Sequence, residues 1–160
     1  MVSIQTPSAT LTPAERFAAD FHQGYEELPA SRRFTAEQLE VIYALGYSHA
    51  QQQQWSQALP IFAFLSQYGP TRRHYLAGLA LCLHMVGRHE EAINIYTLML
   101  VLFPDSLQPS LHIAECQLAQ GDKAGAAETL RQLDAALAPD DALKGRSQAL
   151  LERLQEPAPA

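Results

Sequence analysis

Small, apolar and aromatic residues recur along the chain with a period of 34 residues. The register holds without a gap through three consecutive copies, over residues 39–72, 73–106 and 107–140. The residues that match are Leu45, Leu79 and Ile113; Gly46, Ala80 and Ala114; Ala58, Ala92 and Ala126; Phe62, Tyr96 and Leu130; and Leu65, Met99 and Leu133. Agreement in both residue type and register indicates one structural unit that is repeated three times.

Each copy predicts two helices joined by a tight turn. Gly87 and Gly121 can adopt a positive φ and therefore end the first helix of their copies. Pro70 and Pro104 end the second helix, because proline lacks a backbone donor and clashes with the preceding turn. The small residues of the period allow the two helices to approach closely. The expected helix pairs are 36–51 with 55–67, 72–85 with 89–102, and 106–119 with 123–137.

Capping patterns predict one further helix on each side of the repeats. Thr12-Pro13-Ala14-Glu15 is a capping box with proline at the first helical position, and it begins a helix over residues 12–28. A C-terminal helix over residues 140–154 can be capped by an aspartate at its start. Residues 1–11 and 156–160 are expected to be disordered. Because a 34-residue helix–turn–helix unit is typical of tetratricopeptide repeats, we expect a single all-α solenoid domain over residues 12–155, with the end helices as caps.

Composition agrees with this fold and excludes several classes of function. Alanine and leucine supply 48 residues whereas valine and isoleucine supply 10, a ratio that favours helix over sheet. A formal net charge of −6 argues against binding to nucleic acid or to an anionic membrane surface. The longest apolar run has nine residues, too few to span a membrane, and the N-terminus lacks the features of a secretory signal. We therefore expect a cytoplasmic protein.

The first helices of such an array line a concave groove. The groove positions of this chain carry mostly apolar and aromatic side chains, which favours an extended apolar peptide over a carboxylate clamp. Each of these residues has an alternative interpretation as part of the packed core. The expected peptide-binding residues are Tyr43, Tyr47, Ala50, His74, Ala77, Leu81, His84, Met85, Leu111 and Leu118.

An aromatic stripe marks the predicted N-terminal helix. Phe17, Phe21, Tyr25 and Leu28 follow one another at spacings of four, four and three residues, which places them on one helical face. The stripe either packs on the first repeat and caps its core, or forms a self-association surface. The sequence leaves both interpretations open.

The chain offers little chemistry for catalysis or for metal binding. The six histidines are scattered, and His89-Glu90-Glu91 lacks the second histidine of a zinc protease helix. Cys82 and Cys116 occupy the same position in consecutive copies, where first helices stand about 8–10 Å apart. That separation is too large for a disulfide, so we expect two small buried hydrophobic residues. We expect no catalytic, cofactor or metal site.

The two cysteine-bearing stretches are more specific than the general repeat. Gly78-Leu79-Ala80-Leu81-Cys82, followed by Gly87 and Glu91-Ala92-Ile93, resembles the second repeat of the class II chaperones of bacterial type III secretion. His112-Ile113-Ala114-Glu115-Cys116-Gln117-Leu118, followed by Gly121, resembles the third repeat, which typically reads H-x-A-E-C-x-L-x-x-G. Val41-Ile42-Tyr43-Ala44-Leu45-Gly46-Tyr47 is similar to the first repeat of the family, with its aromatics spaced by four. The resemblance covers about residues 30 to 150.

This resemblance implies a cytoplasmic bacterial chaperone for the hydrophobic translocator proteins of the secretion pore. Members of the family hold an extended N-terminal translocator segment in the concave groove, and they commonly form homodimers through the N-terminal helical region. Tyr43 and Tyr47 fall on groove aromatics of the family, while Ala50 replaces a third. The alternative is a needle-subunit chaperone or a general tetratricopeptide scaffold, which holds a helical partner.

Overall fold

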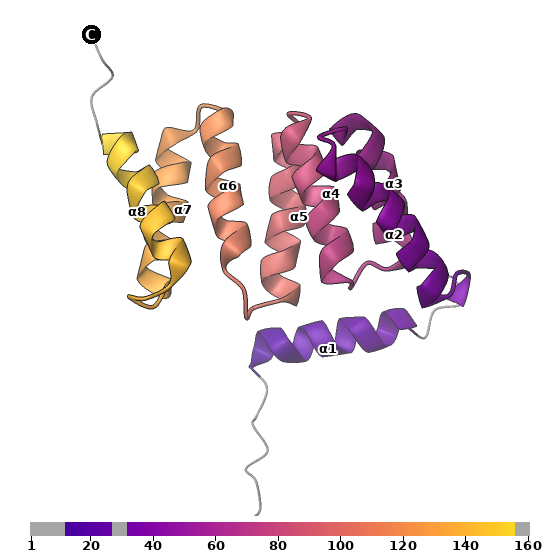
Figure 1. The fold of residues 1–160 in the computed structure, drawn as a ribbon. Helices are drawn as coiled ribbons and strands as arrows, with labels where there is room; N and C mark the ends of the chain where they lie inside the picture. Colours follow the sequence, from indigo (N-terminus) through magenta and orange to yellow (C-terminus); the bar gives the residue numbers. More distant parts are fainter. Residues whose placement is uncertain (1–11, 27–31, 156–160) are drawn as a thin grey trace, which may run out of the picture.

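Eight helices and no strand make up the part of the chain that the structure, a computed structural model, describes: residues 12–26 and 32–155 (Figure 1). They are α1 (Pro13–Glu26), α2 (Ala36–Gln51), α3 (Trp55–Tyr68), α4 (Arg73–Met85), α5 (His89–Leu102), α6 (Gln108–Ala119), α7 (Lys123–Ala136) and α8 (Ala142–Gln155). The fold class is confirmed, and the described helix ends lie within two residues of the expected ones. The segments expected to be disordered, 1–11 and 156–160, lie outside the described residues. None of the described helices combines the length and apolarity that a membrane span requires.

The turn inside each helix pair contains one residue in the left-handed region. Gly87 and Gly121 have φ values of 84° and 83°, as the period predicts. Gln53 occupies the equivalent place in the first copy with a φ of 58°, where a side chain is strained and glycine is not. The second helices of the first two copies end at Tyr68 and Leu102, two residues before their prolines.

Small residues set the distance between the helices of a pair. Ala80 and Ala92 are fully buried between α4 and α5, as the equivalent alanines are between α6 and α7. In the first pair, a Cβ added to Gly46 would lie 2.9 Å from Ile61 Cγ2. The close approach of α2 to α3 therefore requires glycine at this position.

The apolar core of the described residues forms three clusters along the array. The first joins α2, α3 and α4 around Phe62, Leu65 and Tyr75. The second joins α4, α5 and α6 around Tyr96. The third joins α6 and α7 with the leucines of α8, and the hydroxyl of the buried Ser147 in α8 donates a hydrogen bond to the Leu130 carbonyl at 3.2 Å. Because α8 covers the apolar side of the last repeat, it serves as the expected C-terminal cap.

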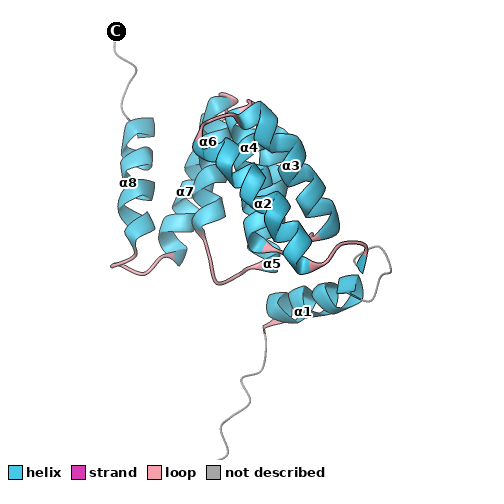
Figure 2. Ribbon diagram, turned by 45° about the vertical axis from the view of Figure 1, so that its right-hand side comes forward, coloured by secondary structure: helices cyan, strands magenta, loops and turns pink. Residues whose placement is uncertain are grey.

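The N-terminal helix α1 lies crosswise to the repeat helices, next to the end of α5 (Figures 1 and 2). Its main contacts are with α5 of the second repeat, so the expectation that it caps the first repeat is wrong. A helix that runs across the array cannot lay its length along α2 and α3. The rings of Phe17 and Phe21 stack with centroids 6.2 Å apart and stay 52% and 41% exposed. Leu28 lies outside the described residues, and the side chain of Tyr25 is not described either.

Candidate peptide-binding groove

Two cavities lie next to each other between the first helices of the repeats. The first groove cavity, about 440 Å³, is lined by Tyr43, Tyr47, Ala50, Gln51, Gln53, Trp55, Phe62, His74, Ala77, Gly78 and Leu81. The second groove cavity, about 480 Å³, is lined by Arg73, Ala77, Leu81, Tyr96, Met99, Phe103, Ser106, Gln108, Pro109 and His112. Ala77 and Leu81 line both cavities, so α4 forms the wall between them.

The two cavities are equivalent through the 34-residue period but differ in character. Tyr43 and Tyr47 of the first groove cavity correspond to Ala77 and Leu81 in the second. Each cavity also contains an aromatic ring from the second helix of a repeat. This ring is Phe62 of α3 in the first cavity and its equivalent, Tyr96 of α5, in the second. The first groove cavity is therefore mainly aromatic, whereas the second has an aliphatic side.

Polar contacts hold the first groove cavity in shape. Glu40 Oε1 accepts a 2.7 Å hydrogen bond from the hydroxyl of the buried Tyr75 and lies 3.0 Å from His74 Nε2. The Tyr75 hydrogen bond is the main cause that lowers the pKa of Glu40, and burial raises the pKa of Tyr75. The rings of Tyr43 and His74 meet edge to face with centroids 4.8 Å apart. These contacts join α2 to α4 and orient Tyr43 and His74 at the cavity.

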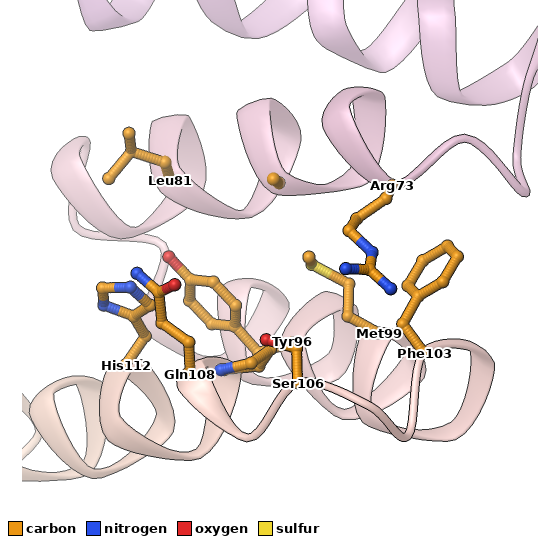
Figure 3. A pocket seen from close by; sticks show the side chains of 10 residues that line it. Arg73, Leu81, Tyr96, Met99, Phe103, Ser106, Gln108 and His112 are labelled. Atoms are coloured by element: carbon orange, nitrogen blue, oxygen red, sulfur yellow. The ribbon is translucent and has the colours of Figure 1, made fainter. Parts of the chain in front are cut away.

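The second groove cavity has an apolar centre and a cation at one end. Figure 3 shows Arg73 and Leu81 on the α4 side, with Met99 and Phe103 close to the Arg73 end. Arg73 Nη2 pairs with Asp105 Oδ1 at 2.6 Å, and its guanidinium lies over the Phe103 ring, 4.7 Å from the centroid. The guanidinium is therefore held in place by a carboxylate and an aromatic face together.

At the α6 side of the same cavity, His112 stacks on Tyr96 with ring centroids 5.1 Å apart (Figure 3). His112 Nδ1 lies 2.9 Å from Glu115 Oε2, one turn further along α6. The second groove cavity thus combines an apolar centre with a few placed polar groups. That combination is typical of sites that bind apolar side chains in a fixed orientation.

Six of the ten predicted peptide-binding residues line the first groove cavity: Tyr43, Tyr47, Ala50, His74, Ala77 and Leu81. Met85 lies outside both groove cavities, in a shallow depression with Gln53 and Trp55, and is half exposed. His84 is half-buried, with its ring centroid 6.5 Å from that of Tyr96.

Two predicted groove residues of the third copy belong to the core. Leu111 is fully buried in the third cluster, so the prediction that it lines the groove is wrong. Leu118 is half-buried and packs against the same cluster. The physical reason is the flanking helix: Leu143, Leu150 and other leucines of α8 pack on this cluster, where an open groove would need free space.

Sequence reasoning missed most of the second groove cavity. The period assigns Tyr96 and Met99 to the core, and both are largely buried, yet each reaches the cavity with part of its side chain. Phe103 and Ser106 come from the loop that follows α5, which the repeat positions do not address. One signal was present in the sequence: the second helices of the first two copies carry an aromatic residue at the same position, Phe62 and Tyr96. The structure places each of these rings at a groove cavity.

Both cysteines are fully buried, and neither is in a disulfide. Burial raises the pKa of the Cys82 and Cys116 thiols to about 11. The thiols are therefore protonated at neutral pH and act as small apolar side chains, as predicted.

Two tetratricopeptide-repeat family models match the chain, over residues 43–107 and 83–154. PcrH from Pseudomonas aeruginosa, solved in complex with the chaperone-binding region of PopD, is 31% identical; the match covers 76% of this chain and 94% of PcrH, with a TM-score of 0.67. The type III secretion translocator chaperone SycD from Yersinia enterocolitica is 25% identical, with 74% and 91% covered and a TM-score of 0.66.

A type III secretion complex from Aeromonas hydrophila is 25% identical, with 88% of this chain and 95% of that chain covered and a TM-score of 0.72. No curated protein sequence matches the chain. The match to PcrH combines 31% identity with nearly full coverage of the relative. The chain therefore belongs to the family of PcrH and SycD, the tetratricopeptide-repeat chaperones of type III secretion translocators.

Proposed function

We propose that this chain is a cytoplasmic bacterial chaperone that binds an extended segment of a hydrophobic translocator protein in its two groove cavities. The observation that carries the proposal is the pair of adjacent, largely apolar cavities that share Ala77 and Leu81. PcrH has been solved with the chaperone-binding regions of PopD and PopB, and SycD with a peptide of the translocator YopD. These complexes support an occupant of the same kind here.

The spacing of the cavities favours an extended occupant. First helices of adjacent repeats stand about 8–10 Å apart. An extended chain in the polyproline II conformation advances about 3.1 Å per residue with three residues per turn, so side chains three residues apart lie on the same face about 9 Å from each other. Two such apolar side chains can therefore reach neighbouring cavities. A helical partner rises only about 1.5 Å per residue and would need anchors six or seven residues apart. The alternative, a needle-subunit chaperone or a general scaffold, requires that second arrangement.

Binding alone accounts for this role. A translocator with membrane-spanning segments exposes apolar surface in water, where it associates with other chains. Burial of its anchor side chains in the cavities contributes about 25 cal/mol per Å² of apolar surface, before the cost of ordering the segment. No bond is made or broken in this scheme, so we propose no catalytic activity.

Co-expression tests the function directly. The chain is produced together with a hydrophobic translocator, and the expected result is a translocator that stays soluble and co-elutes with the chain. A synthetic segment carrying two apolar anchors three residues apart should bind, and the same segment with both anchors replaced by serine should not. A translocator that remains insoluble would contradict the proposal. Preferential binding of a needle subunit that becomes helical would favour the alternative.

We also propose that two copies associate through α1. The stacked Phe17 and Phe21 rings present exposed apolar surface on this helix. SycD has been described as an alternative dimer. Replacing both phenylalanines by glutamate should convert a dimer into a monomer in multi-angle light scattering, because the charges cannot be buried unpaired. Val41→Glu, at another highly exposed apolar residue, is the control and should keep the mass of the wild type. If the double phenylalanine variant also keeps the dimer mass, α1 is excluded as the interface.

A further inference from the structure

Three histidines from three helices gather next to the second groove cavity. His84 lies in the last turn of α4, His89 is the first residue of α5, and His112 lies on α6. The ring centroid of His84 is 5.6 Å from that of His89 and 6.4 Å from that of His112. The period gives these residues no common role, because they occupy different positions of the repeat.

Two overlapping triads of metal-ligating side chains share His84. The ligand atoms of His84, His112 and Glu115 lie within 4.8 Å of one another, and so do those of His84, His89 and Cys116. The Nδ1 atoms of His84 and His89 are buried and have no hydrogen-bond partner among the described residues. A buried polar atom without a partner marks a place where an ion can supply the missing bond.

The triad of His84, His112 and Glu115 is the accessible one. The side chains of His112 and Glu115 are 23% and 28% exposed, and His112 lines the second groove cavity. An ion can therefore reach them from the groove. Cys116 of the other triad is fully buried, and a thiolate would have to form there away from solvent.

We propose that His84, His112 and Glu115 bind Zn²⁺ or a similar transition-metal dication, which joins α4 to α6. Two imidazole nitrogens and one carboxylate oxygen suit Zn²⁺ and leave a fourth position for water, whereas Mg²⁺ prefers oxygen ligands only. Tetrahedral ligands at 2.0–2.2 Å from zinc stand about 3.4 Å apart, so the three partly exposed side chains must close on the ion. His112 exchanges its contact with Glu115 for the metal. Arg146, which is exposed and lies 3.4 Å from Glu115 Oε1, turns away.

Calorimetric titration of the tag-free chain with ZnCl₂ tests the site. The expected result is one Zn²⁺ per chain and no binding of Mg²⁺ under the same conditions. H84Q, H112Q and E115Q should each weaken Zn²⁺ binding by at least about tenfold. The loss of a residue that only supports a metal ligand already has an effect of this size, and each of these variants loses a ligand itself. H49Q, at a histidine outside the cluster, should bind as the wild type does. Zn²⁺ should also raise the thermal midpoint of the wild type but not that of E115Q.

Three results would overturn the proposal. The first is a wild-type chain that does not bind Zn²⁺, and the second is equal binding of Mg²⁺. The third is binding that survives H112Q and E115Q but is lost in C116S, which would place the ion in the triad with Cys116. H112Q and E115Q change partly exposed side chains, so their circular dichroism should match the wild type. These two variants decide the question even if H84Q fails to fold.

Discussion

Replacing Leu81 by aspartate is expected to reduce binding of a translocator segment by at least about thirtyfold. Leu81 lines both groove cavities, so a single carboxylate there faces both apolar anchors of a bound segment. Burying that charge without a partner costs at least about 2 kcal/mol, which corresponds to this loss of affinity. The side chain is 37% exposed in the free chain, so the helix itself should tolerate the change. Fluorescence anisotropy with a labelled segment measures the affinity.

Two variants separate the groove from a general effect of charge. Tyr47→Ala removes a side chain that lines only the first groove cavity, so its loss should be smaller than that of Leu81→Asp. Val41→Asp places the same charge on α2 at a residue that is 72% exposed and lines neither cavity, and it should bind normally. Circular dichroism should show wild-type helicity for all three variants. Wild-type affinity in Leu81→Asp would rule out this groove as the binding site.

Alanine in place of Gly78 is expected to destabilise the chain by about 2 kcal/mol, although alanine favours helix by about 1 kcal/mol. A Cβ added at Gly78 would lie 2.6 Å from Phe62 Cζ and closer still to two other carbons of that ring. Phe62 is 2% exposed and packed in the first cluster, so the ring cannot move aside without disturbing its neighbours. A loss of this size should lower the thermal midpoint by roughly 4–8 °C in a chain of this length.

Gly145→Ala in α8 is the matched control. An added Cβ at Gly145 has no atom within 4 Å, so this variant gains helix propensity without a clash and should be more stable by about 0.5–1 kcal/mol. Urea unfolding of both variants should therefore give changes of opposite sign. Equal stability of Gly78→Ala and the wild type would mean that Gly78 does not set the position of Phe62.

The helix pairs could be predicted because their ends depend on local chemistry. Gly87 and Gly121 adopt the positive φ that glycine permits, and Pro70 and Pro104 follow the helices that they end. The position of α1 could not be predicted in the same way. It lies outside the repeat and is placed by contacts with α5, which no spacing within residues 12–28 encodes.

The lining of the groove cavities was predictable only on the first helices of the repeats, α2 and α4. Tyr43 and Tyr47 were found because groove positions recur on first helices, and both line the first groove cavity. Phe103 was missed because it lies in the loop after α5. Leu111 was misassigned because it belongs to the third core cluster, against which leucines of α8 pack, and α8 is not part of the period. The first error concerns a loop inside the second copy that the groove positions of first helices do not include, and the second concerns a flanking helix outside the repeats.

The division of the core into three clusters has a consequence for how the molecule opens. Each cluster joins only neighbouring helices, so local unfolding can proceed from an end without melting the whole array. At the C-terminal end, α8 has helices on one side only and can separate by breaking a single interface. Helices α4 and α5 are flanked on both sides, so amide hydrogen exchange within them requires two interfaces to break. The wall that both groove cavities share, α4, thus lies in the interior of the array, where local opening must break two interfaces rather than one.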